Sequence, residues 1–167
     1  MIIDAMDILY SGKVNGFCLV SSDSDFTHLA TRLREAGMQV IGIGERKTPN
    51  PFIVACDKFI YIEILKESDT RKVTQTPQPS SESQVEKMDK PTVRLLISTI
   101  EDLADDDGWA FLAAVGAQLN KKKPDFDPRN YGFSKLTPLI SSLNKYFIVD
   151  VKQVENSPVK HVYVKVK

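Results

Sequence analysis

One apolar segment that ends abruptly in acidic residues constrains the fold of this chain more than any other feature. Residues 16–20 have the composition of a short buried strand, and Asp23 and Asp25 follow it before a pattern typical of a helix start. Open α/β sheets place such residues at the carboxyl edge of the sheet, where they bind ligands. The segment therefore predicts an acidic site at a sheet edge.

The chemistry expected at this site depends on what holds the two aspartates together. Their carboxylates repel each other unless a cation or hydrogen-bond donors stabilise them, and hard oxygen ligands suit Mg²⁺ or Mn²⁺. We therefore expect metal-dependent chemistry on phosphate. The alternative is that Asp23 or Ser24 only caps the next helix. Residues 23–27 also fit the DxDxT pattern of haloacid-dehalogenase-type phosphatases. However, too few residues lie between Thr27 and the polar segment that begins at residue 66 for the larger sheet of those enzymes.

Length, charge and cysteine content limit the kinds of protein that this chain can be. The 167 residues allow one medium domain or two small ones, and the net charge of +0 argues against binding nucleic acid by charge alone. No apolar run is long enough to span a membrane. Cys18 and Cys56 lie in apolar sequence surroundings without CxxC spacing, which disfavours zinc and disulfides. We expect a cytoplasmic protein.

The chain divides at a polar segment. Residues 66–91 lack an apolar pattern, and prolines and serines interrupt residues 74–84, which is typical of a flexible linker. This leaves a first part, residues 1–65, and a second part, residues 92–167. The charges differ slightly, with 6 basic and 8 acidic residues in the first part, and 11 basic and 9 acidic residues in the second.

Helix and strand patterns alternate in the first part. The expected helices span residues 2–10, 26–35 and 51–56, and the expected strands span residues 17–20, 38–43 and 59–64. Leu29, Ala30 and Leu33 would face the core. Short connections between alternating strands and helices predict an α/β fold, a partial parallel sheet with flanking helices.

The second part has a different pattern. Helices are expected at residues 92–104, 109–119 and 133–144, followed by a hairpin of residues 147–152 and 161–166. Trp109, Leu112, Ala113 and Leu119 are the expected core positions of the second helix. Three helices and a hairpin predict a small winged helix-turn-helix α+β domain.

Two family resemblances follow from specific segments. Residues 3–7, 17–26, 34–37, 42–49 and 55–59 resemble the NYN domain of the LabA-like, PIN-like ribonuclease group. Residues 107–109, 124–136 and the closing hairpin resemble the LOTUS domain, also called OST-HTH, and the block at 126–136 is the most specific part of that match. Together the two resemblances cover nearly the whole chain outside the linker.

The NYN resemblance implies clustered aspartates that hold one or two Mg²⁺ or Mn²⁺ ions and activate water against a phosphodiester. It implies that Asp23 and Asp25 are catalytic residues and metal ligands, with Asp4 as a further catalytic acid. Ser22 and Asp7 would support them. The resemblance also implies a strand and two acidic positions that this sequence lacks, so we expect an unpaired sheet edge that favours a homodimer.

Basic side chains are the candidates for contact with RNA phosphates. The candidates are Arg46 and Lys47 in the first part, and Lys121, Lys122, Lys123, Arg129 and Lys135 in the second. The alternative for the first two is a solvated turn, and for the lysine run a solvated helix end that favours the helix dipole. Aromatic residues of the second part are interpreted as core rather than as stacking surfaces; these are Trp109, Phe126, Tyr131 and Phe133.

The resemblances predict an RNA-binding protein of metal-dependent ribonuclease type, in which the NYN domain hydrolyses RNA and the LOTUS domain recognises it. LOTUS domains are also associated with protein partners, which adds a second class of ligand. The alternative is a non-catalytic RNA- or protein-binding adapter with a degenerate nuclease domain. Whether the chain is an enzyme therefore stays open at this point.

Overall fold

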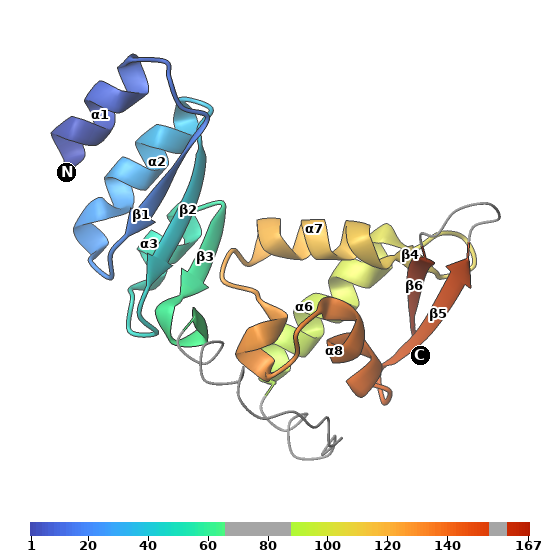
Figure 1. Cartoon of the computed structure of the whole chain (residues 1–167). Helices are drawn as coiled ribbons and strands as arrows, with labels where there is room; N and C mark the ends of the chain where they lie inside the picture. Colours follow the sequence, from blue (N-terminus) through green and yellow to red (C-terminus); the bar gives the residue numbers. More distant parts are fainter. Residues whose placement is uncertain (66–87, 154–159) are drawn as a thin grey trace. The chain divides into compact units, whose positions relative to one another are not determined.

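A computed structural model describes residues 1–65, 88–153 and 160–167 (Figure 1). The chain forms two compact units, of which the first contains residues 1–65 together with the segment Lys123–Phe126. The second unit contains the other described residues. Most of the expected linker, residues 66–87, lies outside the described residues.

The first unit contains a three-stranded parallel sheet. Strands β1 (Gly16–Val20), β2 (Gln39–Gly44) and β3 (Lys58–Tyr61) pair in the order β1-β2-β3. The helices are α1 (Ile2–Tyr10), α2 (Thr27–Glu35) and α3 (Asn50–Ala55), with a short 3-10 helix η1 (Ser24–Phe26) ahead of α2. Figure 1 shows these elements in blue to green. The predicted α/β fold is confirmed.

The strand register explains the largest difference between a predicted and an observed boundary in this unit. Gly44, the last residue of β2, pairs with Tyr61, so β3 has no described partner strand beyond Tyr61. Residues 62–65 are helical, although the apolar composition of residues 59–64 predicted a strand up to Ile64. The prediction followed the local pattern, whereas the length of the neighbouring strand decides where pairing stops.

The core of the first unit lies between the sheet and its helices. Leu29, Ala30 and Leu33 of α2 are buried, as predicted, and they belong to one cluster with Phe52 and Phe59. Helix α1 contributes one buried residue to that cluster, while Met6 and Leu9 pack against it. The other apolar residues of α1, and Met1 before it, are exposed; those in the helix are Ile2, Ile3, Ile8 and Tyr10.

The two cysteines lie in different surroundings. Cys56 is buried and Cys18 is exposed on β1, and both are free. Burial raises the pKa of the Cys56 thiol to about 11, so this thiol stays protonated at neutral pH. Although its sequence neighbours are apolar, Cys18 is exposed because it lies on the face of β1 opposite to the buried Leu19.

The second unit combines three helices with a small antiparallel sheet. Its elements are α6 (Lys90–Leu103), β4 (Ala110–Phe111), α7 (Leu112–Lys122), η2 (Pro128–Tyr131), α8 (Leu136–Ser142), β5 (Phe147–Gln153) and β6 (Lys160–Val166). The strand order is β4-β6-β5, and both pairings are antiparallel. The predicted small α+β domain with a closing hairpin is confirmed.

Two helix predictions in this unit are wrong in detail. The second helix begins at Leu112 rather than Trp109, because Ala110 and Phe111 pair with β6 instead. Ala113, an expected core position, is exposed. The third helix is shorter than residues 133–144, since Lys135 has an extended backbone (φ −144°, ψ 162°) that cannot belong to a helix.

Candidate functional site

The ends of β1 and β2 are joined by hydrogen bonds that bring two acidic loops together. The Ser21 N–H donates to the Ile43 carbonyl at 2.9 Å, which extends the ladder just beyond β1. The Glu45 N–H then donates to the Ser22 hydroxyl at 2.8 Å. The loops that carry Asp23 and Glu45 therefore start side by side at the carboxyl edge of the sheet. We call Ser22, Asp23, Asp25 and Glu45 the acidic edge.

A glycine allows this close approach. A Cβ atom on Gly44 would lie 2.5 Å from the Ser21 carbonyl oxygen and 2.7 Å from the Thr48 hydroxyl. Neither distance is tolerable for a real side chain, and the first contact is with backbone. The absence of a side chain at Gly44 thus lets the loop after β1 pack against the end of β2.

Asp23 caps the short helix that follows it. Its Oδ1 accepts a hydrogen bond from the Asp25 N–H at 3.0 Å, so Asp23 has the capping role that sequence analysis left open. Its own N–H donates to the Ser21 hydroxyl at 3.1 Å. Asp23 and Asp25 are both exposed. Within the described residues no hydrogen bond engages Asp23 Oδ2, so that oxygen is available to a ligand.

Two cationic candidates flank the acidic edge on the loop after β2. Lys47 Nζ lies 2.6 Å from Glu45 Oε2, and this hydrogen bond raises the pKa of Lys47. The Arg46 guanidinium lies over the Tyr61 ring at 5.7 Å, and its backbone N–H donates to Glu63 Oε1 at 3.1 Å. The loop therefore offers one partly neutralised ammonium group and one guanidinium beside the acidic edge.

Glu45 is the residue of the acidic edge that sequence reasoning missed as a candidate. It directly follows β2, and the next strand is followed closely by Glu63. The available signal was an acidic residue just after each of the parallel strands, since the carboxyl ends of parallel strands share one edge of the sheet.

The other predicted acids lie on α1. Asp4 is exposed and pairs with the N-terminal ammonium group at 2.7 Å, and this contact lowers the pKa of Asp4. Asp7 is also exposed. Among the residues that the structure describes, no hydrogen bond or ion pair joins Asp4 or Asp7 to the acidic edge.

The acidic edge suits a hydrated divalent ion better than a metal enclosed by protein ligands. No group of three His, Cys, Asp or Glu side chains within the described residues is arranged to hold a metal. Mg²⁺ commonly keeps several waters and binds through one or two carboxylates together with substrate phosphates. The exposed carboxylates of Asp23 and Asp25 fit that mode of binding.

Two of the predicted RNA-binding residues in the second unit are engaged by acids. Lys122 Nζ pairs with Asp102 at 2.7 Å and bonds the Thr99 hydroxyl at 3.2 Å. Arg129 forms a two-pronged contact with buried Asp127 through Nε (3.0 Å) and Nη2 (2.7 Å), which raises the pKa of Arg129. Both side chains are therefore held by acidic partners within the second unit.

The remaining basic candidates occupy different elements. Lys121 lies in the last turn of α7, and Lys135 is the exposed residue that precedes α8. Lys123 is half-buried and lies in the segment assigned to the first unit. Of the three lysines in the run, Lys121 and Lys122 are exposed and Lys123 is half-buried, and their contact with RNA stays a prediction.

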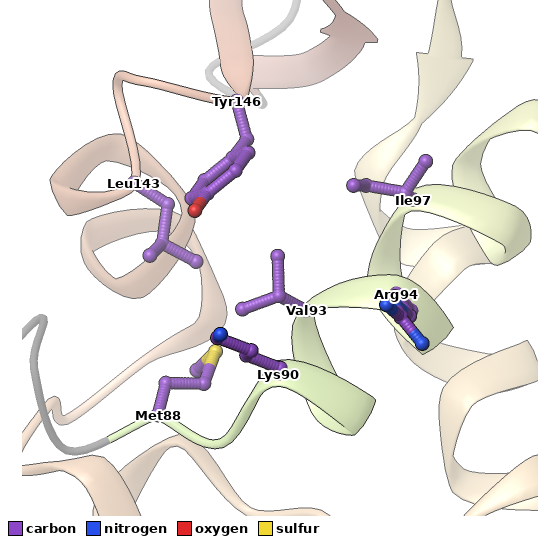
Figure 2. A pocket seen from close by; sticks show the side chains of 7 residues that line it. All are labelled: Met88, Lys90, Val93, Arg94, Ile97, Leu143 and Tyr146. Carbon is purple, nitrogen blue, oxygen red and sulfur yellow. The ribbon is translucent and has the colours of Figure 1, made fainter.

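An apolar pocket of about 350 Å³ lies within the second unit (Figure 2). Leu143 and Tyr146 line one side of it, and residues of α6 line the other. The lining residues are Met88, Lys90, Val93, Arg94, Ile97, Leu143 and Tyr146. Among the described residues that line this pocket there is no carboxylate, cysteine or histidine, and its titratable groups are those of Lys90, Arg94 and Tyr146.

Comparisons with known proteins agree with these two units. Residues 1–63 match the NYN domain family, and residues 83–159 match the OST-HTH/LOTUS domain family. No curated protein matches the chain. No described helix has the length and apolar character needed to cross a membrane.

Two solved structures are similar to part of the chain. One is an uncharacterized protein from Nitrosomonas europaea, 34% identical, covering 57% of this chain and 90% of its own length with a TM-score of 0.44. The other is a protein fragment from Chromobacterium violaceum, 35% identical, covering 48% of this chain and 84% of its own length with a TM-score of 0.35.

Proposed function

Because the chain belongs to the NYN family in its first part and to the OST-HTH/LOTUS family in its second, we propose that it binds RNA and hydrolyses phosphodiester bonds in RNA with a divalent metal. The observation that carries this proposal is the acidic edge. It lies at the carboxyl ends of parallel strands, where α/β folds bind ligands. Its exposed carboxylates suit a hydrated cation.

Three residues of the acidic edge, and the two basic residues beside it, have roles in this proposal. Asp23 Oδ2 and the Asp25 carboxylate hold Mg²⁺ or Mn²⁺, while the cap formed by Asp23 Oδ1 fixes the orientation of that side chain. Ser22 ties the two loops together. Arg46 and Lys47 contact phosphates of the bound strand. The metal, when bound, supplies an activated water and neutralises charge that develops on the phosphate.

A second candidate function has one observation in its favour. This function is that of a non-catalytic adapter that binds RNA or protein, and the observation is the sheet edge at β1. The sheet edge at β1 would serve such an adapter as a surface for self-association, since β1 is unpaired on its outer side among the described strands.

The proposal is tested with end-labelled single-stranded and structured RNAs, incubated with the full chain in Mn²⁺, Mg²⁺ or EDTA. We expect metal-dependent cleavage by the wild type and a loss of at least about 100-fold in Asp23→Asn, as expected when one charged group that binds the metal becomes neutral. Asparagine caps helices as well as aspartate does. The variant should therefore keep its fold while losing the metal.

The matched control is Asp106→Asn, which makes the same chemical change at an exposed residue of the second unit. It should cleave at the wild-type rate. Cleavage that persists in Asp23→Asn would place the active site elsewhere. RNA binding without cleavage in either metal would favour the adapter.

A further inference from the structure

The outer face of the antiparallel sheet in the second unit carries three aromatic rings. The register pairs Phe111 of β4 with Tyr163 of β6, while His161 lies two residues earlier on β6 and therefore on the same face. Lys152 of β5 pairs with His161 and shares that face. We call Phe111, His161, Tyr163 and Lys152 the aromatic face.

The rings of the aromatic face contact one another. Phe111 and His161 are stacked, with centroids 5.2 Å apart and planes at 29°, and Phe111 and Tyr163 are tilted at 5.7 Å. Lys152 Nζ lies 5.1 Å from the Tyr163 centroid. The group thus forms a continuous aromatic surface with an ammonium group above one ring.

Core packing does not explain this surface. The residues that alternate with these rings fill the core instead, since Ala110 and Val164 are fully buried. Phe111 is 39% exposed, and the apolar side chain of Ile148 is exposed on the same face. The rings of His161 and Tyr163 are half-buried. Cross-strand aromatic pairs do stabilise sheets, but that role alone does not require a ring as open to solvent as that of Phe111.

The charges on this face favour an anionic ligand. Lys152 and Lys165 lie on it, and Lys165 Nζ donates to a neutral acceptor, the Asp107 carbonyl, at 2.6 Å. Asp150, opposite Tyr163, is the acidic residue on these strands that shares the face. Solvent-exposed rings beside lysines are the arrangement by which proteins bind single strands, stacking bases on the rings and placing phosphates near the cations.

We propose that the aromatic face binds single-stranded RNA, with bases stacked on Phe111 and Tyr163 and a phosphate beside Lys152. This inference rests on the proposed RNA-binding function and assigns part of that function to the sheet of the second unit. It differs from the sequence-based candidates of the second unit, which lie on the helix end and loops of residues 121–135.

The test measures binding of fluorescein-labelled oligouridine to the full chain by fluorescence anisotropy, in EDTA so that no metal-dependent cleavage occurs. Phe111→Leu and Tyr163→Leu should each weaken binding by about fivefold or more, because stacking of one base on one ring is lost. Lys152→Gln should lower the slope of log K against log salt by about one. Phe111→Trp and Tyr163→Trp should retain binding.

The matched control is Val151→Ala, which removes an exposed apolar side chain from the opposite side of β5 and should bind like the wild type. Thermal unfolding of each variant shows that its fold is intact. A second readout is photocrosslinking with 5-bromouridine RNA, expected on peptides that contain Phe111 or Tyr163. A merely structural role for the rings would give no such crosslink.

The outcomes separate the two proposals. If the wild type binds neither oligouridine nor structured RNA, the RNA-binding function fails and the aromatic face fails with it. If the wild type binds RNA but the leucine variants bind equally well and no crosslink reaches the sheet, the aromatic face is wrong and RNA binding stands.

Discussion

Phe59→Ala is expected to unfold the first unit at 25 °C while the second unit keeps its fold. Phe59 is 1% exposed and packs edge-on against Phe52 at 6.0 Å and against Tyr61 at 5.4 Å. Truncating a buried phenylalanine to alanine costs about 3–5 kcal/mol. A domain of roughly 65 residues has a stability of similar size.

The cavity left by this change has little means of closing. A Cβ atom on Gly42 would lie 2.6 Å from the Phe59 ring, so the ring rests directly on the backbone of β2, the central strand of the described sheet. That backbone is paired on both sides and cannot move into the space. We therefore expect Phe59→Ala to lower the free energy of unfolding by close to about 5 kcal/mol, the upper end of this range.

Two-dimensional amide NMR spectra of the full chain measure this effect, since they report on each unit separately. The expected result is loss of dispersion for residues 1–65 with unchanged signals from the second unit. The control is Ile3→Ala, at an apolar residue that is 75% exposed, which should leave every signal dispersed. A Phe59→Ala spectrum that is dispersed throughout, with an unchanged urea midpoint, would contradict the account of this core.

Asp127→Ala is expected to lower the free energy of unfolding of the second unit by about 2–3 kcal/mol. Asp127 is 7% exposed, and its Oδ1 caps η2 by accepting from the Arg129 N–H at 2.9 Å. The same carboxylate accepts hydrogen bonds from Nε and Nη2 of the Arg129 guanidinium group. Loss of a cap costs about 1 kcal/mol, and hydrogen bonds to a charged group contribute more. Because Arg129 is partly exposed, water compensates some of the loss.

Urea unfolding followed by far-ultraviolet circular dichroism measures this change. Asp127→Asn should lose less than Asp127→Ala, because asparagine retains the cap but lacks the charge that pairs with Arg129. Asp106→Ala, at an exposed aspartate, serves as the control. A loss below about 0.5 kcal/mol in Asp127→Ala would show that this carboxylate does not organise η2.

Local sequence patterns predicted the elements whose limits are set locally. Helix α1 has the predicted bounds, and β1, α2, β2 and α3 differ from their predictions by about one residue. The apolar spacing of Leu29, Ala30 and Leu33 identified the buried side of α2 correctly. In these elements the apolar periodicity and the nearby residues that end helices or strands indicate the same bounds, so the bounds could be predicted without knowledge of distant contacts.

The failures occur where a distant segment determines the local structure. Trp109 was expected to start a helix, but β4 forms because Ala110 and Phe111 pair with Val164 and Tyr163, more than 50 residues away in the sequence. The strand predicted to reach Ile64 ends at Tyr61 for a similar reason. Non-local strand pairing leaves no signal in a local window.

The same limit applies to the candidate sites. The position of Asp23 after a strand was visible in the sequence, but its proximity to Glu45 depends on a hydrogen bond between two loops. The aromatic face depends on the register of three strands that are distant in sequence. His161 in particular carried no signal until β6 placed it against Phe111.

The most direct test of the central claim is to locate a bound metal. Mn²⁺ is paramagnetic and broadens the amide signals of residues near its site, so titration of the full chain with Mn²⁺ maps where the ion binds. We expect selective broadening at Ser22, Asp23, Asp25 and Glu45, which disappears in Asp23→Asn and persists in Asp106→Asn. Broadening that centres on another part of the chain, or that is unchanged in Asp23→Asn, would contradict the proposal that the acidic edge holds the metal.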